Sequence, residues 1–264
     1  MTGFSFGSYI PGTSPIHKLD PRTKLLLGCA FIIVLLCAKS ALALVIAAAF
    51  VVAVYLAARI PAIKAFQSLA PLLAIVIIVA ILNLFTATEG TAIIDLGLLK
   101  IRDTGVTAAA FMAARLTIMM LGMSLITLTT MTIDLTEAFE RLLSPLARFG
   151  FPAHELGMIM GIALRFMPQF ASELSTIYHA QISRGAKLAN SPVKGLRMLS
   201  SVMVPLFTSV FRHAETLSSA MDARCYHGGI GRGRLHPLRF AARDAAALAA
   251  MVVLAICVIA ANMV

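Results

Sequence analysis

The chain has 264 residues, of which 59% are hydrophobic and 13% are charged, and its formal net charge is +10. Its mean hydropathy of +0.91 is far above that of a soluble globular domain. The basic residues flank apolar runs rather than forming an aromatic-studded patch, so the positive charge does not indicate nucleic-acid binding. Because no segment alternates like a barrel strand, we predict an all-α polytopic membrane protein.

Five apolar runs predict about five membrane-spanning helices, at 25–38, 42–58, 69–85, 108–129 and 245–264. The first helix is expected to begin before its apolar run, with Asp20 as its N-cap and Pro21 as its first residue. Basic residues in the leader and in the second loop favour a cytoplasmic location for both segments, and therefore a cytoplasmic N-terminus: Lys18, Arg22, Lys24, Arg59 and Lys64.

The segment 132–238 is long and mixed in polarity, and it lies on the cytoplasmic side in this topology. We expect it to form a separate coupling region between the membrane helices of 1–131 and a last membrane helix in 239–264. Its predicted helices lie at about 134–144, 152–185 and 193–225. The first should begin near Asp134 and Glu137, which resemble a capping arrangement, and lie flat at the membrane face.

The two longer helices each carry a seam of apolar residues spaced alternately by four and three, which is typical of helices that pack on a partner helix. At about 50 Å each, they could cross one another, and Pro168 could kink the first. The seam of the first helix runs through Leu156, Met160, Ala163, Met167, Phe170, Leu174 and Ile177. That of the second runs through Leu199, Met203, Leu206, Val210, His213, Leu217 and Ala220.

Continuing these seams leads to an arginine at the end of each helix, Arg184 and Arg224. A guanidinium group is a planar fork of donors that binds carboxylates in a bidentate manner, so an arginine at a rigid helix tip suits docking into an acidic groove. The alternative is that each arginine only complements its helix dipole or contacts a phospholipid.

The sequence offers little of the chemistry that an enzyme needs. No segment matches GxxxxGK[ST], so the chain is not expected to bind ATP by itself, and its histidines show no metal-binding spacing. The glycines and arginines of 228–234 are best explained as a flexible basic linker. Arg115, inside the fourth apolar run, is either a helix partner, an interfacial side chain or a substrate contact.

Several segments together resemble the T components of energy-coupling factor transporters, over nearly the whole chain. They are the leader from Tyr9 to Ser14, the motif His17-Lys-Leu-Asp-Pro-Arg-Thr-Lys24, Leu128-Thr-Thr, His154-Glu-Leu and Leu164-Arg-Phe-Met-Pro168. Two Ala-Arg-Gly-like motifs match at the helix ends, Ser183-Arg184-Gly185 and Ala223-Arg224-Cys225. The resemblance leans toward the T component type that several substrate-binding subunits share, rather than the type dedicated to one.

This resemblance implies a subunit of the bacterial cell membrane that binds no cofactor directly. Two ABC-type ATPase subunits, EcfA and EcfA′, would use ATP and Mg²⁺ and dock on the two arginine motifs. One or several S components would carry a vitamin or metal ion. Methionines could contact the S component or simply pack the helices: Met158, Met160, Met167, Met198 and Met203.

The second arginine motif departs from the family pattern, because Cys225 stands where glycine is expected. Glycine adopts the left-handed conformation that ends many helices more easily than cysteine does, so this helix end could differ in shape, with Gly228 and Gly229 making the turn instead.

The competing function is a conventional ABC importer permease, which would itself line the substrate path.

Overall fold

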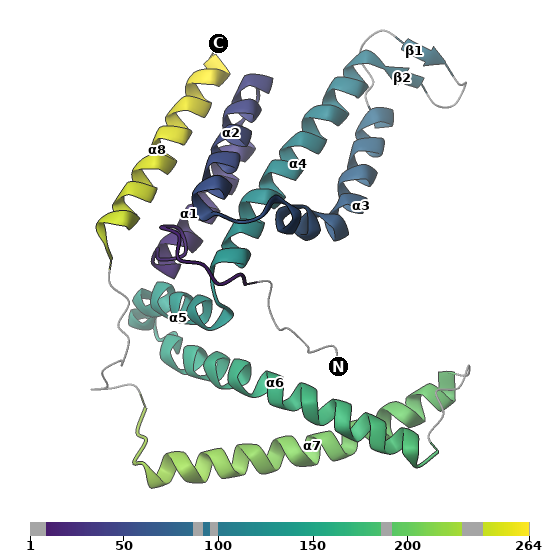
Figure 1. The fold of residues 1–264 in the computed structure, drawn as a ribbon, viewed down its shortest axis with the longest axis vertical. Helices are drawn as coiled ribbons and strands as arrows, with labels where there is room; N and C mark the ends of the chain where they lie inside the picture. Colours follow the sequence, from purple (N-terminus) through teal and green to yellow (C-terminus); the bar gives the residue numbers. More distant parts are fainter. Residues whose placement is uncertain (1–8, 87–91, 96–99, 186–191, 229–239, 264) are drawn as a thin grey trace. The chain divides into compact units, whose positions relative to one another are not determined.

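The computed structural model describes residues 9–86, 92–95, 100–185, 192–228 and 240–263, and their regular secondary structure is helical apart from one short hairpin. The all-α class is therefore confirmed. The chain divides into two compact units (Figure 1). One, the membrane bundle, contains α1 to α4, the first part of α5 and α8; the other, the coupling unit, contains the rest of α5, η1, α6 and α7.

The helices of the membrane bundle follow the predicted apolar runs, each within a few residues. They are α1 (Pro21–Cys37), α2 (Ala41–Ala58), α3 (Ala62–Thr86), α4 (Asp103–Thr129) and α8 (Ala242–Met263). Three of them, α2, α4 and α8, are long and apolar enough to cross a membrane. The 17-residue α1 and the apolar part of α3, Leu73–Thr86, are shorter, so their two spans stay predictions.

A two-stranded antiparallel hairpin lies between α3 and α4, a segment for which the apolar runs predicted no helix. It pairs β1 (Ala92–Asp95) with β2 (Lys100–Arg102). The strands hold only four and three residues, too few to show the alternating pattern by which a strand is recognised in a sequence.

Side chains at the helix ends explain where the bundle helices begin and stop. As predicted, Asp20 caps α1, because its carboxylate accepts a hydrogen bond from the Arg22 backbone N–H at 2.9 Å. At the other end of α1, the Arg115 guanidinium donates to the Ala38 carbonyl and lies over the Phe111 ring. Of the three roles considered for Arg115, the structure therefore supports a helix partner.

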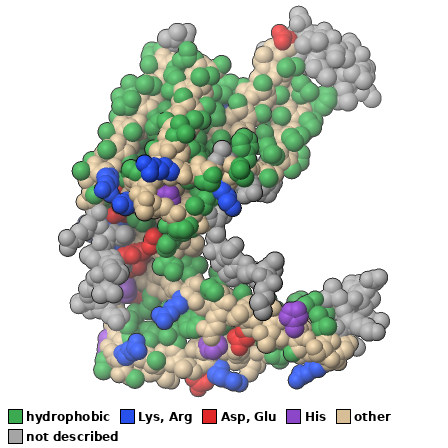
Figure 2. Space-filling view, viewed as in Figure 1, with side chains coloured by type: hydrophobic (Ala, Val, Ile, Leu, Met, Phe, Trp, Pro, Cys, Tyr) green, Lys and Arg blue, Asp and Glu red, His purple; other side chains and the backbone are tan. Residues whose placement is uncertain are grey.

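The core of the bundle lies between α1, α2, α4 and α8, and its most buried side chains include Leu35 and Val258. Two glycines let α1 and α4 approach closely: a Cβ on Gly28 would lie 2.3 Å from Ile126, and one on Gly122 would lie 2.3 Å from Phe31. Figure 2 shows apolar side chains over the outside of the bundle, with lysines and arginines gathered at one end. Such an apolar exterior suits a helical bundle whose solvent is lipid.

The coupling unit contains the end of α5 (Thr132–Leu143) together with η1 (Ser144–Phe149), α6 (Ala153–Ser183) and α7 (Pro192–Ala223). Helix α5 begins two residues earlier than predicted, so Asp134 lies in its first turn instead of capping it. Pro152 is the N-cap of α6 rather than its first residue, and the helix continues through Pro168. With 31 and 32 residues, α6 and α7 are each nearly 50 Å long.

Candidate functional site

The two arginine motifs end their helices with the same backbone geometry. Arg184 follows the last helical residue of α6, and Gly185 after it is left-handed, with φ of +87°. Arg224 likewise follows the last residue of α7, and Cys225 after it is left-handed, with φ of +54°. In both motifs the left-handed residue donates its N–H to a carbonyl three residues back, Ile182 at 2.9 Å and Asp222 at 2.9 Å. Each arginine is therefore exposed at the turn that closes a long helix.

The expected change of shape at Cys225 is wrong, because this cysteine adopts the conformation that glycine would adopt. The Tyr226 N–H also bonds to the Met221 carbonyl at 3.1 Å, which completes a Schellman motif at the end of α7. Gly228 is left-handed too, with φ of +90°, but it lies beyond this turn. Gly229, the other glycine considered, and most of the expected basic linker lie outside the described residues.

Tyr226 fixes the segment after this turn to α6, since its hydroxyl lies 2.8 Å from the Met158 sulfur. Met158 thus has a role within the coupling unit. The tip of α7 is held by its own cap and by the neighbouring helix, so Arg224 stands on a supported turn.

We predict that substituting the third residue of each motif changes the stability of the helix end in opposite directions. Cys225→Gly should relieve roughly 1 kcal/mol of left-handed strain, whereas Gly185→Ala should introduce a similar cost. Amide hydrogen exchange at residues 221–226 should slow in the first variant, and exchange at 180–185 should quicken in the second. Equal exchange in both variants and the wild type would show that these positions carry no strain.

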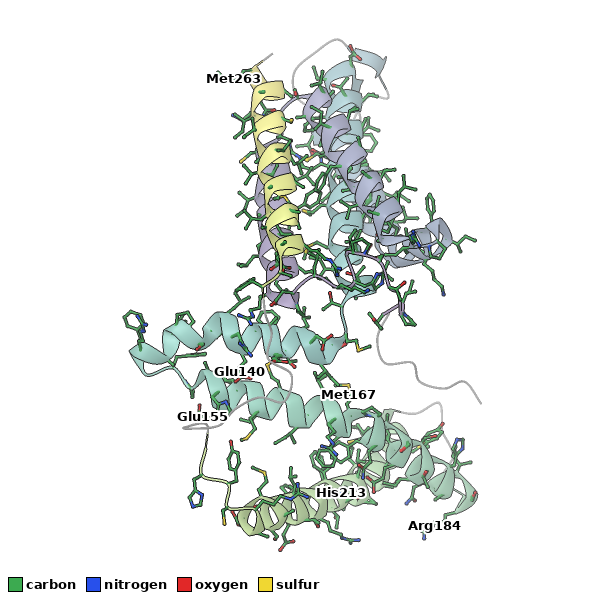
Figure 3. All side chains as sticks on the ribbon, turned by 60° about the vertical axis from the view of Figure 1, so that its left-hand side comes forward. Glu140, Glu155, Met167, Arg184, His213 and Met263 are labelled. Carbon is green, nitrogen blue, oxygen red and sulfur yellow. The ribbon has the colours of Figure 1, made fainter. Side chains whose placement is uncertain are left out.

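A polar layer holds α6 and α7 together in the middle third of each helix. The Glu173 carboxylate of α6 accepts a hydrogen bond from the Ser209 hydroxyl and lies 3.7 Å from His213 Nε2. Gln169 lies 3.2 Å from the same histidine nitrogen, and the rings of Phe166 and Phe170 stack around the imidazole. Figure 3 shows His213 between the two helices, with Arg184 at the end of α6. Glu173 and His213 are therefore interhelical residues.

This layer shifts the predicted contact face of α6. Phe170 and Ile177 of the predicted seam are half-buried, but Phe166 and Glu173 replace Met167 and Leu174, which are 41% and 37% exposed. Apolar spacing did not indicate Glu173 as a contact residue, because its side chain is charged. On α7 the predicted seam is correct from Met203 to Leu217, whereas Leu199 is exposed and its neighbours Met198 and Val202 are buried.

The five methionines of the predicted S-component contact do not lie in one kind of environment. Met160 and Met167 are exposed on α6, Met158 and Met203 are half-buried, and Met198 is buried, with 7% exposed. Met160 and Met167 belong to the predicted seam of α6, but both are exposed in the structure. Large apolar side chains are exposed on α7 as well, among them Val204, Phe207 and Phe211.

A second set of contacts connects α5 to α6 within the coupling unit. The Glu140 carboxylate lies 3.0 Å from His154 Nδ1. The Glu140 side chain also passes close to Gly157 of α6, where an added Cβ would lie 2.5 Å from the carboxylate. Gly157 is thus required by a close approach inside the chain. Gly161, the second glycine of the same GxxxG sequence, has open space beside it.

Comparison with known proteins agrees with this architecture. Residues 12–237 match the CbiQ family, described as "Cobalt transport protein". The energy-coupling factor transporter transmembrane protein EcfT of Thermosediminibacter oceani is 42% identical over 257 residues, which are 97% of each chain. The protein of that name from Clostridium kluyveri is 40% identical over 258 residues, 97% of this chain and 96% of that one.

A longer protein of Bifidobacterium longum contains a similar sequence. It is named a putative ABC transporter ATP-binding protein and is 37% identical over 252 residues, which are 95% of this chain and 32% of that protein. The bundle and these similarities together define a transmembrane subunit of a transporter. The chain belongs to the CbiQ family, and it is the transmembrane component of an energy-coupling factor transporter.

Proposed function

We propose that this chain is the coupling subunit that links ATP hydrolysis by two ABC-type ATPase subunits to the movement of an S component. The observation that carries the proposal is the matched pair of helix tips, in which Arg184 and Arg224 each stand at a capped turn. Two equivalent tips suit two equivalent acidic grooves, and a guanidinium fork suits carboxylates. The relative from Bifidobacterium longum supports an ATPase partner, because its name describes ATP binding and two thirds of its length lie outside the similarity.

Rigid helices are what a coupling subunit needs between its ATPases and the membrane. Helices α6 and α7 provide them, since the Glu173 layer fixes their crossing and each helix runs unbroken from that layer to its arginine. The exposed apolar residues of α6 and α7 would then bind the S component, with Met160 and Met167 as adaptable contacts. Lysines and arginines gathered at one end of the bundle favour that end as the cytoplasmic one.

The interior of the bundle argues against the alternative of a permease that lines the substrate path. A cavity of about 230 Å³ among the described residues of the bundle is lined by apolar residues except for Lys24 and Thr129. A polar vitamin or a metal ion crossing such a cavity would lose its hydration without compensating hydrogen bonds. The substrate is therefore expected to travel in a different subunit.

Affinity purification of the chain from its native membrane in mild detergent, with mass identification of its partners, tests this proposal. We expect two ABC-type ATPases together with one or several small hydrophobic proteins. Several small partners would indicate a shared coupling subunit, and one would indicate a dedicated subunit. A periplasmic binding protein and a second permease in their place would support the conventional importer.

A further inference from the structure

Lys24 is buried in the first turn of α1, although it was predicted to be one of the charges that mark the cytoplasmic side. Only 5% of the residue is exposed. Its ammonium donates to the Thr129 carbonyl at 2.9 Å and to the His17 carbonyl at 3.3 Å. Thr129 is the last residue of α4, where helix carbonyls lack intrahelical partners. Since burying an ammonium is costly unless it is bonded, these contacts make Lys24 a cap for α4.

The leader supports the same helix end. The Ile10 N–H donates to the Leu128 carbonyl at 3.0 Å, and the Ile10 carbonyl lies 3.0 Å from His17 Nε2. The other nitrogen of His17 lies 2.6 Å from the Ser14 hydroxyl. Gly12 leaves room for the imidazole, because an added Cβ would lie 2.7 Å from that ring. The leader thus folds around its histidine and holds the end of α4 from a second direction.

The start of α8 is attached to this same region. The buried Asp244 carboxylate accepts from the Asp20 N–H at 2.9 Å with one oxygen, and from the Ala241 N–H at 2.8 Å with the other. Asp20 is the N-cap of α1, so the beginnings of α1 and α8 are tied directly. The Lys24 ammonium also interacts electrostatically with Asp244 and with Asp134 in the first turn of α5.

The environment of Asp134 makes this interaction relevant to α5. Although Asp134 is exposed, loss of part of its hydration raises the pKa of its carboxyl above its usual range, and the Glu137 carboxylate raises it further, whereas the Lys24 ammonium lowers it. Lys24 therefore favours the ionised carboxylate at the beginning of α5. Negative charge in a first helical turn also complements the helix dipole.

The chain leaves the membrane bundle for α6 and α7 through the α4–α5 elbow, which we define as residues 129–134, and returns to the bundle at α8. We propose that Lys24 is a positioning residue that holds the α4–α5 elbow through its bond to the Thr129 carbonyl, while the neighbouring Asp20–Asp244 hydrogen bond fixes the start of α8, so that movement of the coupling helices reaches the membrane helices. This inference rests on the proposed coupling function. It assigns to these two neighbouring contacts the two places where the chain passes between the bundle and the coupling helices.

Lys24→Met tests the proposal in the complete complex, because methionine keeps most of the volume and loses the ammonium. The variant should still co-purify with the ATPases and hydrolyse ATP, but substrate uptake per ATP should fall by about tenfold, as the loss of charge-assisted hydrogen bonds implies. The exposed Lys18, changed to Met, is the matched control and should couple normally. Wild-type uptake per ATP in Lys24→Met would overturn the proposal.

A second variant covers the case in which Lys24→Met fails to insert. Asp134→Asn leaves Lys24 in place and removes only the charge at the start of α5, so uptake per ATP should fall by a few-fold. Where Lys24→Met does insert, the double variant should lose no more uptake than Lys24→Met alone, because the interaction with Asp134 is already removed in that variant. Normal coupling in Asp134→Asn, or additive losses, would contradict the role of Lys24. Absence of ATPases from the wild-type complex would instead refute the proposed function itself.

Discussion

Replacing both helix-tip arginines with alanine should abolish substrate uptake while the chain still inserts into the membrane. Removing one partner of a desolvated charged pair at an interface costs about 2–5 kcal/mol, so Arg184→Ala and Arg224→Ala should each reduce uptake at least tenfold. Insertion should be unaffected, because both side chains are exposed and neither belongs to the core of the bundle. Uptake of a labelled substrate by cells, with the chain quantified in isolated membranes, measures both effects.

Arg212→Ala is the matched control for this experiment. Arg212 is also exposed on α7, but it lies within the helix rather than at its capped end. Its removal should leave uptake within about twofold, as is usual for exposed charges away from a binding site. Equal losses in Arg212→Ala and Arg224→Ala would mean that overall positive charge, rather than the tip, matters.

Removing the Glu173 carboxylate should produce the second large effect, through the crossing of α6 and α7. Glu173→Ala leaves the Ser209 hydroxyl and the His213 imidazole without their interhelical partner, at a cost of about 1–3 kcal/mol. The two helices should then vary in their crossing, and uptake should fall several-fold although both arginines remain. Distances between spin labels placed near Ser183 and Ala223 should broaden in the variant.

Glu215→Ala controls for the loss of a negative charge from this region, because Glu215 is exposed on α7 two residues after His213. It should change neither uptake nor the distance distribution. A narrow, wild-type distribution in Glu173→Ala would show that apolar packing alone, including Phe166 and Phe170, fixes the crossing.

Periodicity and composition predicted most of the helices, because a long apolar run or a repeated spacing of four and three is a strong signal. They could not identify the contact face of α6 correctly. There, Glu173 accepts a hydrogen bond from α7 and lies 3.7 Å from His213, and an apolar pattern cannot reveal such a polar contact. Its partner Ser209 was missed for the same reason.

The sequence also could not predict the left-handed backbone of Cys225 or the burial of Lys24. Cysteine rarely adopts positive φ, so the expectation of a changed turn at Cys225 was reasonable, yet the hydrogen bonds of the Schellman motif hold it there. Lys24 stands just before an apolar run and therefore resembled an interfacial charge. Only the fold brings it to the end of α4, which is 105 residues away in sequence.

The membrane bundle and the coupling unit differ in what makes them predictable. Bundle helices are determined by apolar length, which composition reports directly. For the arginine tips, the apolar seams and the family resemblance both indicated Arg184 and Arg224. Only the resemblance included Gly185, which the structure places in a left-handed turn.

Cross-linking from the tip of α7 tests the coupling account most directly, because Cys225 already provides an exposed thiol next to Arg224. The other three cysteines would be replaced with alanine, and Cys225 would be labelled with a photoreactive maleimide in the purified complex. We expect adducts between this chain and an ABC-type ATPase subunit, and none when the label is placed instead by Lys39→Cys, at the exposed turn between α1 and α2. Adducts only with lipid or with a second copy of the chain would contradict the account.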